Sequence, residues 1–291
     1  MSEAWQGYGM THLMDVIDSA PIFFGSTYAE ARELFRDACA SRDIIIDEYR
    51  HPLNAPDGDM LATDIALVGP QDAANLLIVI AGTHGVEGLA GSGGQVAWLR
   101  LHERADLPPA TAVLLIHMLN PWGCAWARRQ TEDNVDLNRN FCDFEEALPN
   151  NPLYEAVHDI VVSPAPVVRA ADDAALTEFR RTHGDTTLAA ALFSGQYQHS
   201  DGVGFGGNKA TWSHDTLRAI IARYAMTAKR TVVLDIHTGL GPFGYGTLLS
   251  AEAPGSDAFE SNQCYVLIDV GWLWHLCRDV ADYANVSRDR N

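Results

Sequence analysis

Two histidines and a glutamate in this sequence have the types and positions that a zinc ion requires. His84 and Glu87 lie three residues apart in the segment GTHGVEG, directly after the apolar run NLLIVIA. His237 directly follows a second apolar run, TVVLDI, and precedes a glycine-containing turn. Neutral imidazole and carboxylate suit Zn²⁺, and two histidines with one glutamate leave a fourth position open, as in catalytic sites. The sequence therefore predicts a zinc site formed by His84, Glu87 and His237.

Each of these residues also has a plainer interpretation. His84 and Glu87 alone fit a polar loop at a strand end, and His237 alone fits a half-buried histidine whose hydrogen bonds are satisfied. The occurrence of all three at strand ends favours the metal site. Asp235 lies two residues before His237 on the same strand face, so we expect its carboxylate to orient that histidine.

A polar segment, LNPWGCAWARRQTEDNVDLNRNF, follows a third apolar run. It carries the arginines Arg128, Arg129 and Arg139 and, among its asparagines, Asn134, Asn138 and Asn140. The guanidinium group of arginine can donate two hydrogen bonds to a carboxylate, and an arginine near a zinc ion can stabilise an oxyanion. A surface loop whose arginines pair with Glu132, Asp133 and Asp136 remains an open alternative.

Buried strands that alternate with helices must position these side chains. Apolar runs predict strands near residues 44–46, 64–68, 75–81, 111–118 and 231–236. Helical spacing predicts helices at 28–42, 94–103 and 213–227. The pattern indicates an α/β fold, a three-layer sandwich with a central mixed, mostly parallel sheet flanked by helices. Ligands collect at the carboxyl ends of strands in such sheets, where the three polar segments lie.

The composition limits the function classes. The chain has 291 residues, of which 47% are hydrophobic and 20% charged, the balance of a globular protein. Its net charge of −18 argues against nucleic-acid binding and disfavours an anionic membrane surface. Five cysteines without a CxxC pair predict a reducing compartment. No signal peptide or membrane-length apolar run is recognisable, so we expect a cytoplasmic protein.

The motifs THGVEG, NPWG followed by VDLNRNF, and LDIHTG occur in this order. Together they resemble the zinc carboxypeptidases of the carboxypeptidase A superfamily over residues 20–258. With SGQY and GFGG, the sequence is most similar to a bacterial branch of unknown function within that superfamily. The resemblance implies a single zinc-exopeptidase-like α/β domain over residues 1–291, in which His84, Glu87 and His237 bind Zn²⁺.

The resemblance also implies roles for the polar segment. Asn138 and Arg139 match the pair that holds the substrate carboxylate, and Arg128 or Arg129 matches the arginine that polarises the scissile carbonyl. The implied reaction is zinc-dependent hydrolysis of a peptide or amide bond next to a free carboxylate, in a small peptide or acylated amino acid, as in a metallocarboxypeptidase. Two alternatives stay open: an N-acyl-amino-acid deacylase of the aspartoacylase type, and a catalytically silent protein that binds zinc and carboxylates.

Residues 259–291 depart from the pattern of the resembling family. The family's general-base glutamate lies on a late strand, whereas only Glu252 and Glu260 follow His237 here, in a loop-like stretch. We therefore expect an atypical tail over 259–291, truncated, frame-shifted or divergent, and weak catalysis for want of a positioned base.

Overall fold

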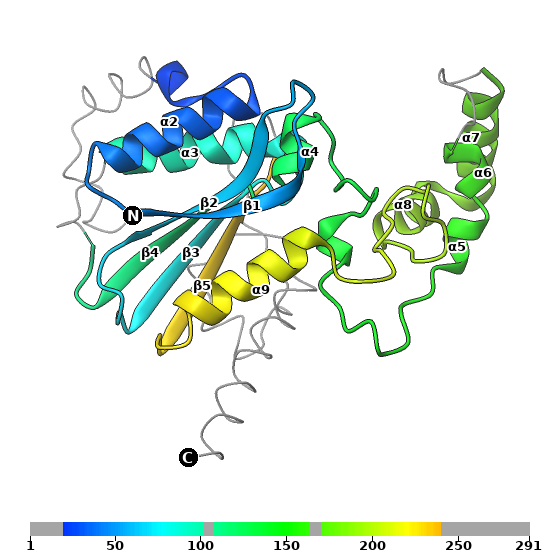
Figure 1. Cartoon of the computed structure of the whole chain (residues 1–291). Helices are drawn as coiled ribbons and strands as arrows, with labels where there is room; N and C mark the ends of the chain where they lie inside the picture. The colour runs from blue at the N-terminus through cyan, green and yellow to red at the C-terminus, as the bar shows by residue number, and fades with distance from the viewer. Residues whose placement is uncertain (1–19, 102–106, 163–169, 240–291) are drawn as a thin grey trace, which may run out of the picture. The chain divides into compact units, whose positions relative to one another are not determined.

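The computed structural model describes residues 20–101, 107–162 and 170–239, including their side chains except those of 170–172. The described chain divides into two compact units (Figure 1). The first contains the chain up to Ala127 and again from Thr227, and the second runs from Arg128 to Met226. The single-domain organisation expected from the sequence stays a prediction.

The first unit contains a five-stranded sheet with the order β1-β2-β4-β3-β5. The strands are β1 (Ile46–Asn54), β2 (Met60–Val68), β3 (Asn75–Ala81), β4 (Thr111–His117) and β5 (Arg230–Ile236). β2 is antiparallel to both β1 and β4, whereas β3 is parallel to both β4 and β5. The predicted α/β class, with a mixed sheet flanked by helices, is confirmed. Among the five strands of this sheet, parallel pairing is confined to β3 and its two neighbours.

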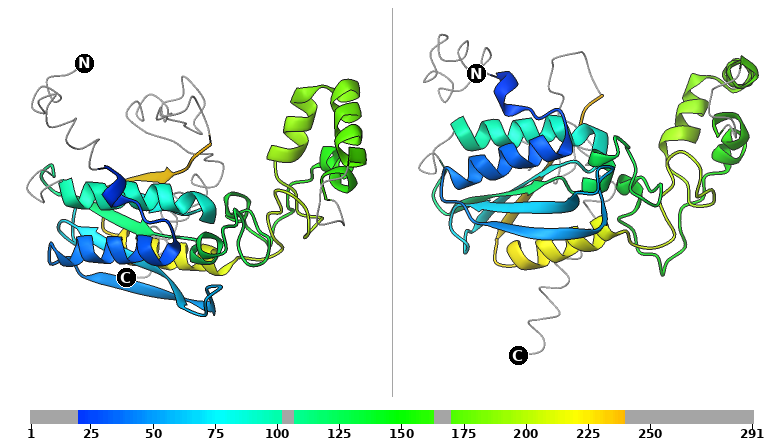
Figure 2. Two further views of the ribbon diagram at one scale, coloured as in Figure 1. Left: turned by 90° about the horizontal axis from the view of Figure 1, so that it is seen from above. Right: turned by 45° about the horizontal axis from the view of Figure 1, so that its top comes forward.

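Helices α2 (Tyr28–Ala40) and α3 (Gly88–Leu101) lie side by side over one face of this sheet (Figure 2). The side chain of Thr27 caps α2 by accepting a hydrogen bond from the Glu30 amide. Both helices bury an apolar face against the strands. The buried side chains between them and the sheet include Phe35, Cys39, Val79, Val96, Leu99, Val113 and Leu115.

The first strand extends well beyond its predicted position. The β-branched run at 44–46 reaches the strand only at Ile46, and β1 continues to Asn54 because it pairs along β2. A turn closes this hairpin, since the Ala55 amide donates to the Asp59 carbonyl at 2.8 Å. Gly58 lies in that turn with φ +93°, a backbone conformation that favours glycine.

Helix α3 begins at Gly88, whereas the sequence predicted a helix from residue 94. Glycine at positions 91 and 93 of this helix allows neighbouring segments to pack closely against it. A Cβ atom at Gly91 would lie 2.8 Å from the Cβ of Ala81, and one at Gly93 would lie 2.2 Å from the Phe24 ring. The approach at Gly91 places the first half of α3 directly against the end of β3, and the approach at Gly93 places it against Phe24.

Shorter helices complete the first unit: η2 (Ala20–Phe23), η3 (Gly85–Glu87) and α4 (Pro121–Ala125). The second unit is largely helical, with η5 (Leu137–Arg139), α5 (Pro152–Glu155), α6 (His158–Val161), α7 (Ala170–His183), α8 (Asp185–Phe193) and α9 (Trp212–Tyr224). Tyr154, Val157, Phe179, Leu188 and Ala191 form a buried cluster in this unit. Within the described ranges, no helix combines the length and apolar character needed to cross a membrane.

Candidate metal centre

The pairing of β3 with β5 brings His84 and His237 together. Ala81, the last residue of β3, pairs with Ile236, the last residue of β5. His237 follows β5 directly, and His84 lies three residues beyond β3. Because the two strands are parallel neighbours, both histidines emerge at the same edge of the sheet.

A tight glycine turn directs Glu87 back toward this edge. Gly82 has φ +76°, and a Cβ atom at Gly85 would lie 2.0 Å from the carbonyl carbon of Gly123. η3 then turns the chain, with the Glu87 amide donating to the His84 carbonyl at 3.1 Å. Glycine at these two positions therefore allows His84 and Glu87 to share one site.

Glu87 lies between the two histidines. Its Oε1 is 2.9 Å from His84 Nδ1, and its Oε2 is 3.1 Å from His237 Nδ1. The amide of Thr238 also donates to Oε2 at 2.7 Å. The three side chains are only 4%, 10% and 12% exposed in the order His84, Glu87 and His237. One potential ligand atom from each lies within 4.8 Å of the others.

Asp235 holds the opposite side of the His237 ring. Its Oδ2 lies 2.9 Å from His237 Nε2, and its Oδ1 accepts a hydrogen bond from the Thr83 hydroxyl at 2.8 Å. Asp235 is buried, so its position is determined by the sheet and by Thr83. The hydrogen bond matches the orienting contact expected from the sequence.

The electrostatics of this centre favour a positive charge between the carboxylates. Burial opposes ionisation of Glu87, but hydrogen bonds with His237, His84 and the Thr238 amide outweigh it and hold the pKa of Glu87 well below its usual range. Burial likewise opposes a charge on His237. Hydrogen bonds with Asp235 and Glu87 outweigh it and raise the pKa of His237 to about 10.

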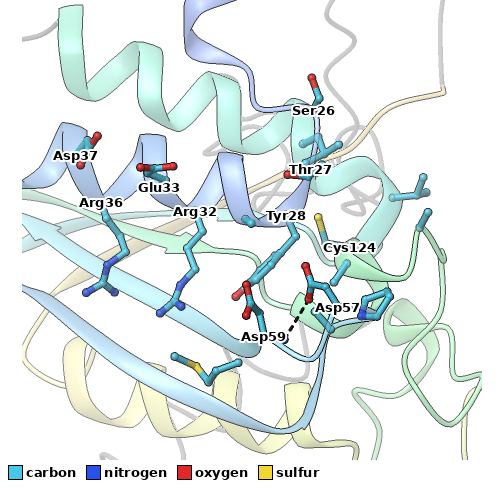
Figure 3. Close-up of a pocket in the computed structure, with 18 residues that line it drawn as sticks. Ser26, Thr27, Tyr28, Arg32, Glu33, Arg36, Asp37, Asp57, Asp59 and Cys124 are labelled. Carbon is cyan, nitrogen blue, oxygen red and sulfur yellow. Dashed lines mark hydrogen bonds between the residues drawn. The ribbon is translucent and has the colours of Figure 1, made fainter.

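The first unit also has a cavity of about 650 Å³ beside α2, the hairpin loop and α4 (Figure 3). Arg32 and Arg36 extend from α2 into this region. Both guanidinium groups pair with the buried carboxylate of Asp64, at 2.7 and 2.9 Å. These arginines link α2 to β2, and the cavity contains none of the three predicted zinc ligands.

Asn138 and Arg139 are neighbours in η5, within the second unit. Asp136 caps this short helix by accepting a hydrogen bond from the Asn138 amide at 3.1 Å. The Arg139 guanidinium donates to the carbonyls of Phe193 and Asn138, at 2.6 and 3.1 Å. A Cβ atom at Gly195 would lie 2.5 Å from Arg139 Cδ, so the SGQY segment packs directly on this arginine.

The other arginines of the polar segment have different surroundings. Arg129 pairs with Asp136 at 3.2 Å, as in the surface-loop alternative, although Asp136 itself is buried. Arg128 is exposed. Both lie in the second unit, and the zinc-ligand candidates lie in the first.

Asn134 and Asn140 hold neighbouring loops in place through hydrogen bonds from their side chains to the backbone. Asn134 Nδ2 donates to the carbonyls of Ser200 and Gly202. The buried Asn140 side chain donates to Gly206 and accepts from the Thr211 amide, both at 2.9 Å. Hydrogen bonds to the backbone therefore account for both asparagines.

The helix-capping role of Asp136 and the loop-holding role of Gln196 were not predicted from the sequence. Asp136 stands directly before the LNR turn, and aspartate at that position is a common helix N-cap. Gln196 belongs to the SGQY motif, but no local pattern indicated that its side chain would hold a loop. Glu252, Glu260 and the segment 259–291 lie outside the described residues.

A family model described as a protein of unknown function, DUF2817, matches residues 24–268. The chain belongs to the DUF2817 family. Comparison of this DUF2817 sequence with curated proteins finds no match.

Several solved structures are similar to this DUF2817 chain at low identity. The carboxypeptidase A from Helicoverpa armigera is 14% identical with a TM-score of 0.39, and the match covers 73% of this chain and 46% of that one. The chain thus spans less than half the length of that carboxypeptidase. A Zn-dependent exopeptidase from Parabacteroides distasonis is 11% identical with a TM-score of 0.31. A glutaminyl cyclase from Tannerella forsythia is 12% identical with a TM-score of 0.32. Each of the latter two matches covers 79% of this chain and 84% of the other.

Proposed function

We propose that this chain is a zinc-dependent hydrolase that cleaves a peptide or amide bond next to a free carboxylate. The observation that carries the proposal is the position of Glu87 between the Nδ1 atoms of His84 and His237, at the ends of two parallel strands. Buried imidazole and carboxylate groups that converge in this way are the donor set of a catalytic zinc site.

The spacing of the donor atoms fits such an ion. Ligand atoms around a tetrahedral zinc lie about 3.3 Å apart, given Zn–N distances near 2.0–2.1 Å. The separations of 2.9 and 3.1 Å between Glu87 and the two imidazole nitrogens are close to this value. Zinc binding would replace these two hydrogen bonds, each made by a different Glu87 oxygen, and draw together ligand atoms that already lie within 4.8 Å of one another.

A bound zinc ion would supply Lewis-acid chemistry, lowering the pKa of water toward ~7 and polarising a carbonyl. The protein's own residues prepare the centre for that chemistry. Asp235 fixes the ring orientation and tautomer of His237, and the Thr238 amide holds Glu87. Their hydrogen bonds keep both ligand side chains in place before any substrate arrives.

Asn138 and Arg139 are the candidate residues for substrate recognition. Asn138 and Arg139 would hold the free carboxylate of the substrate, because a guanidinium group can donate two parallel hydrogen bonds to it. Arg128 or Arg129 would stabilise the negative charge that develops on the carbonyl oxygen. Single Arg128→Ala and Arg129→Ala variants would identify which one does so, since only the loss of that arginine should lower kcat strongly.

The test combines metal analysis with a substrate screen. Purified full chain, stripped with a chelator and reloaded with Zn²⁺, is given blocked dipeptides and N-acyl amino acids, each as free acid and as amide. We expect zinc-dependent hydrolysis of the free acids that His84→Ala and His237→Ala abolish. Hydrolysis confined to N-acyl amino acids would favour a deacylase, and His84-dependent zinc binding without turnover would favour a silent binding protein. Hydrolysis that survives both chelation and His84→Ala would overturn the proposal.

A further inference from the structure

A second group of metal-binding side chains lies within the second unit. Glu155 ends α5, His158 begins α6, and His199 and Asp201 belong to the loop between α8 and α9. One potential ligand atom from each of His158, His199 and Asp201 lies within 4.8 Å of the others. Glu155 adjoins them, since its Oε1 is 2.9 Å from His199 Nε2. His158 Nε2 is 3.7 Å from Asp201 Oδ1.

Hydrogen bonding within the described residues leaves one buried nitrogen of the adjacent His158 and His199 imidazoles without a partner. Their rings are stacked with centroids 3.8 Å apart, and the ring of Tyr154 packs beside both. The Nδ1 atom of His158 is buried without a hydrogen-bond partner among the described residues. Two adjacent imidazoles beside two carboxylates form a set of ligands that could coordinate a cation.

The backbone that carries two of these residues is held by buried contacts. The buried Gln196 side chain donates to the His199 carbonyl at 2.7 Å and accepts from the His199 amide at 2.8 Å. Asn134 donates to the carbonyls on both sides of Asp201, those of Ser200 and Gly202. The side chains of His199 and Asp201 therefore project from a loop whose path is already determined, so metal binding would move these side chains and not the loop that carries them.

We propose that Glu155, His158, His199 and Asp201 form a second site for a divalent first-row metal ion, with Zn²⁺ as the best fit. Two imidazoles and two carboxylates are typical zinc ligands, and four protein ligands close the coordination shell as in a structural site. For tetrahedral coordination, the ligand atoms must lie about 3.3 Å apart and point toward one ion. Because the ring nitrogens of stacked imidazoles point along parallel planes, the two rings must tilt relative to each other. The side chains of Glu155 and Asp201 are 55% and 69% exposed, which leaves both carboxylates room to move inward.

The second site would have a structural role, because its ligands come from three different segments of the second unit. Metal binding would tie α5 and α6 to the loop after α8. That loop includes Tyr197, whose hydroxyl donates to the Arg139 carbonyl at 2.6 Å. The site would thus stiffen the surroundings of Arg139 without taking part in the chemistry of the first centre.

The test counts the zinc ions bound to the full chain. Chelator-stripped protein is titrated with Zn²⁺ in competition with a chromogenic chelator. We expect two ions of submicromolar affinity for the wild type, one for His158→Ala/His199→Ala, and one for His84→Ala/His237→Ala. His183→Ala, which removes an exposed histidine elsewhere in the second unit, should still bind two.

A conservative variant covers the case in which the double histidine variant does not fold. Glu155→Gln/Asp201→Asn keeps the size of both side chains and should weaken one of the two ions at least tenfold. Unchanged binding in either folded variant overturns the second site, as does a wild type that binds only the ion lost in His84→Ala/His237→Ala. A wild type whose only ion depends on His158 and His199 would instead overturn the first centre and support this one.

Discussion

At the residue scale, Glu87 is the side chain on which the candidate centre depends. It contacts histidines that follow two different strands and also accepts a backbone hydrogen bond from Thr238. Asp235 acts indirectly, because it contacts only one of these histidines and lies on its far side. The two carboxylates should therefore respond differently to substitution: Glu87 as a ligand, and Asp235 as a residue that positions one.

Asp235→Asn should weaken zinc binding by about 10–100-fold without abolishing it. The amide keeps the shape of the carboxylate but removes the negative charge beside His237 Nε2. Competition with a chromogenic chelator measures the change. Asp57→Asn, in the hairpin loop, serves as the control and should bind zinc like the wild type. Equal affinities for the two variants would show that the Asp235 charge is irrelevant.

Arg139→Ala should raise KM for free-acid substrates by the equivalent of roughly 1–3 kcal/mol, and Arg139→Lys by less. Lysine retains the charge but lacks the planar fork that binds both carboxylate oxygens. Steady-state kinetics on matched acid and amide substrates provide the measurement, with the exposed Arg180→Ala as control. If the amide is cleaved as efficiently as the acid, Arg139 does not bind a carboxylate.

At the scale of elements, α3 shows how glycine allows one element to approach another. Gly91→Ala should destabilise the protein, because the new Cβ atom would lie 2.8 Å from the Cβ of Ala81. Gly94→Ala should stabilise it by about 0.5–1 kcal/mol, because Gly94 is exposed and alanine favours the helix. Urea denaturation of both variants tests the pair. A stabilised Gly91→Ala variant would refute the close packing.

The contact of β4 with α2 and α3 should make stability depend on pH. His117 is fully buried, stacks on Phe35 and lies 2.8 Å from the Ser92 hydroxyl. Burial, with a smaller effect of the Arg32 charge, lowers the pKa of His117 from 6.5 to about 3. The folded state thus binds fewer protons than the unfolded state between these pH values. The contribution is complete above the unfolded pKa and is lost as the pH falls toward 3.

We therefore expect the free energy of unfolding to fall by up to about 1.4 kcal/mol per pH unit below pH ~6 because of this one group. The His117→Gln variant cannot titrate at this position, so its stability should change less over the same range. Urea denaturation of both proteins at several pH values between 7 and ~4.5 measures the difference. Parallel pH dependences would assign the acid sensitivity to other groups.

At the scale of the whole molecule, each unit contains its own histidine and carboxylate cluster. The candidate centre of the first unit joins residues separated by about half of the chain, so the unfolded chain offers no comparable site. Zinc at 100 times its Kd should therefore stabilise the folded state by about 2.7 kcal/mol and raise the Tm by about 5–10 °C. Thermal scans with zinc and with a chelator test this. His84→Ala/His237→Ala should lose the part of the shift that its centre contributes, and a wild-type Tm indifferent to zinc would contradict the expectation.

Local sequence patterns were sufficient to predict the α/β class and most elements of the first unit. Apolar runs located β3, β4 and β5, and helical spacing located α2 and α9. The close spacing of His84 with Glu87 and of Asn138 with Arg139 was also visible, because each pair belongs to one turn. Such features depend on interactions within a few residues, which periodicity and motif spacing record directly.

Which residues far apart in the sequence lie in contact could be seen only in the tertiary structure. The parallel register of β3 and β5 brings His237 to Glu87, and the packing of α8 and its following loop brings His199 to His158. The short helices α5 and α6 and the bracing roles of Asn134 and Asn140 were not predicted. These arrangements arise from strand pairing, close packing and hydrogen bonds across long stretches of chain, and no local pattern of residue types records such contacts.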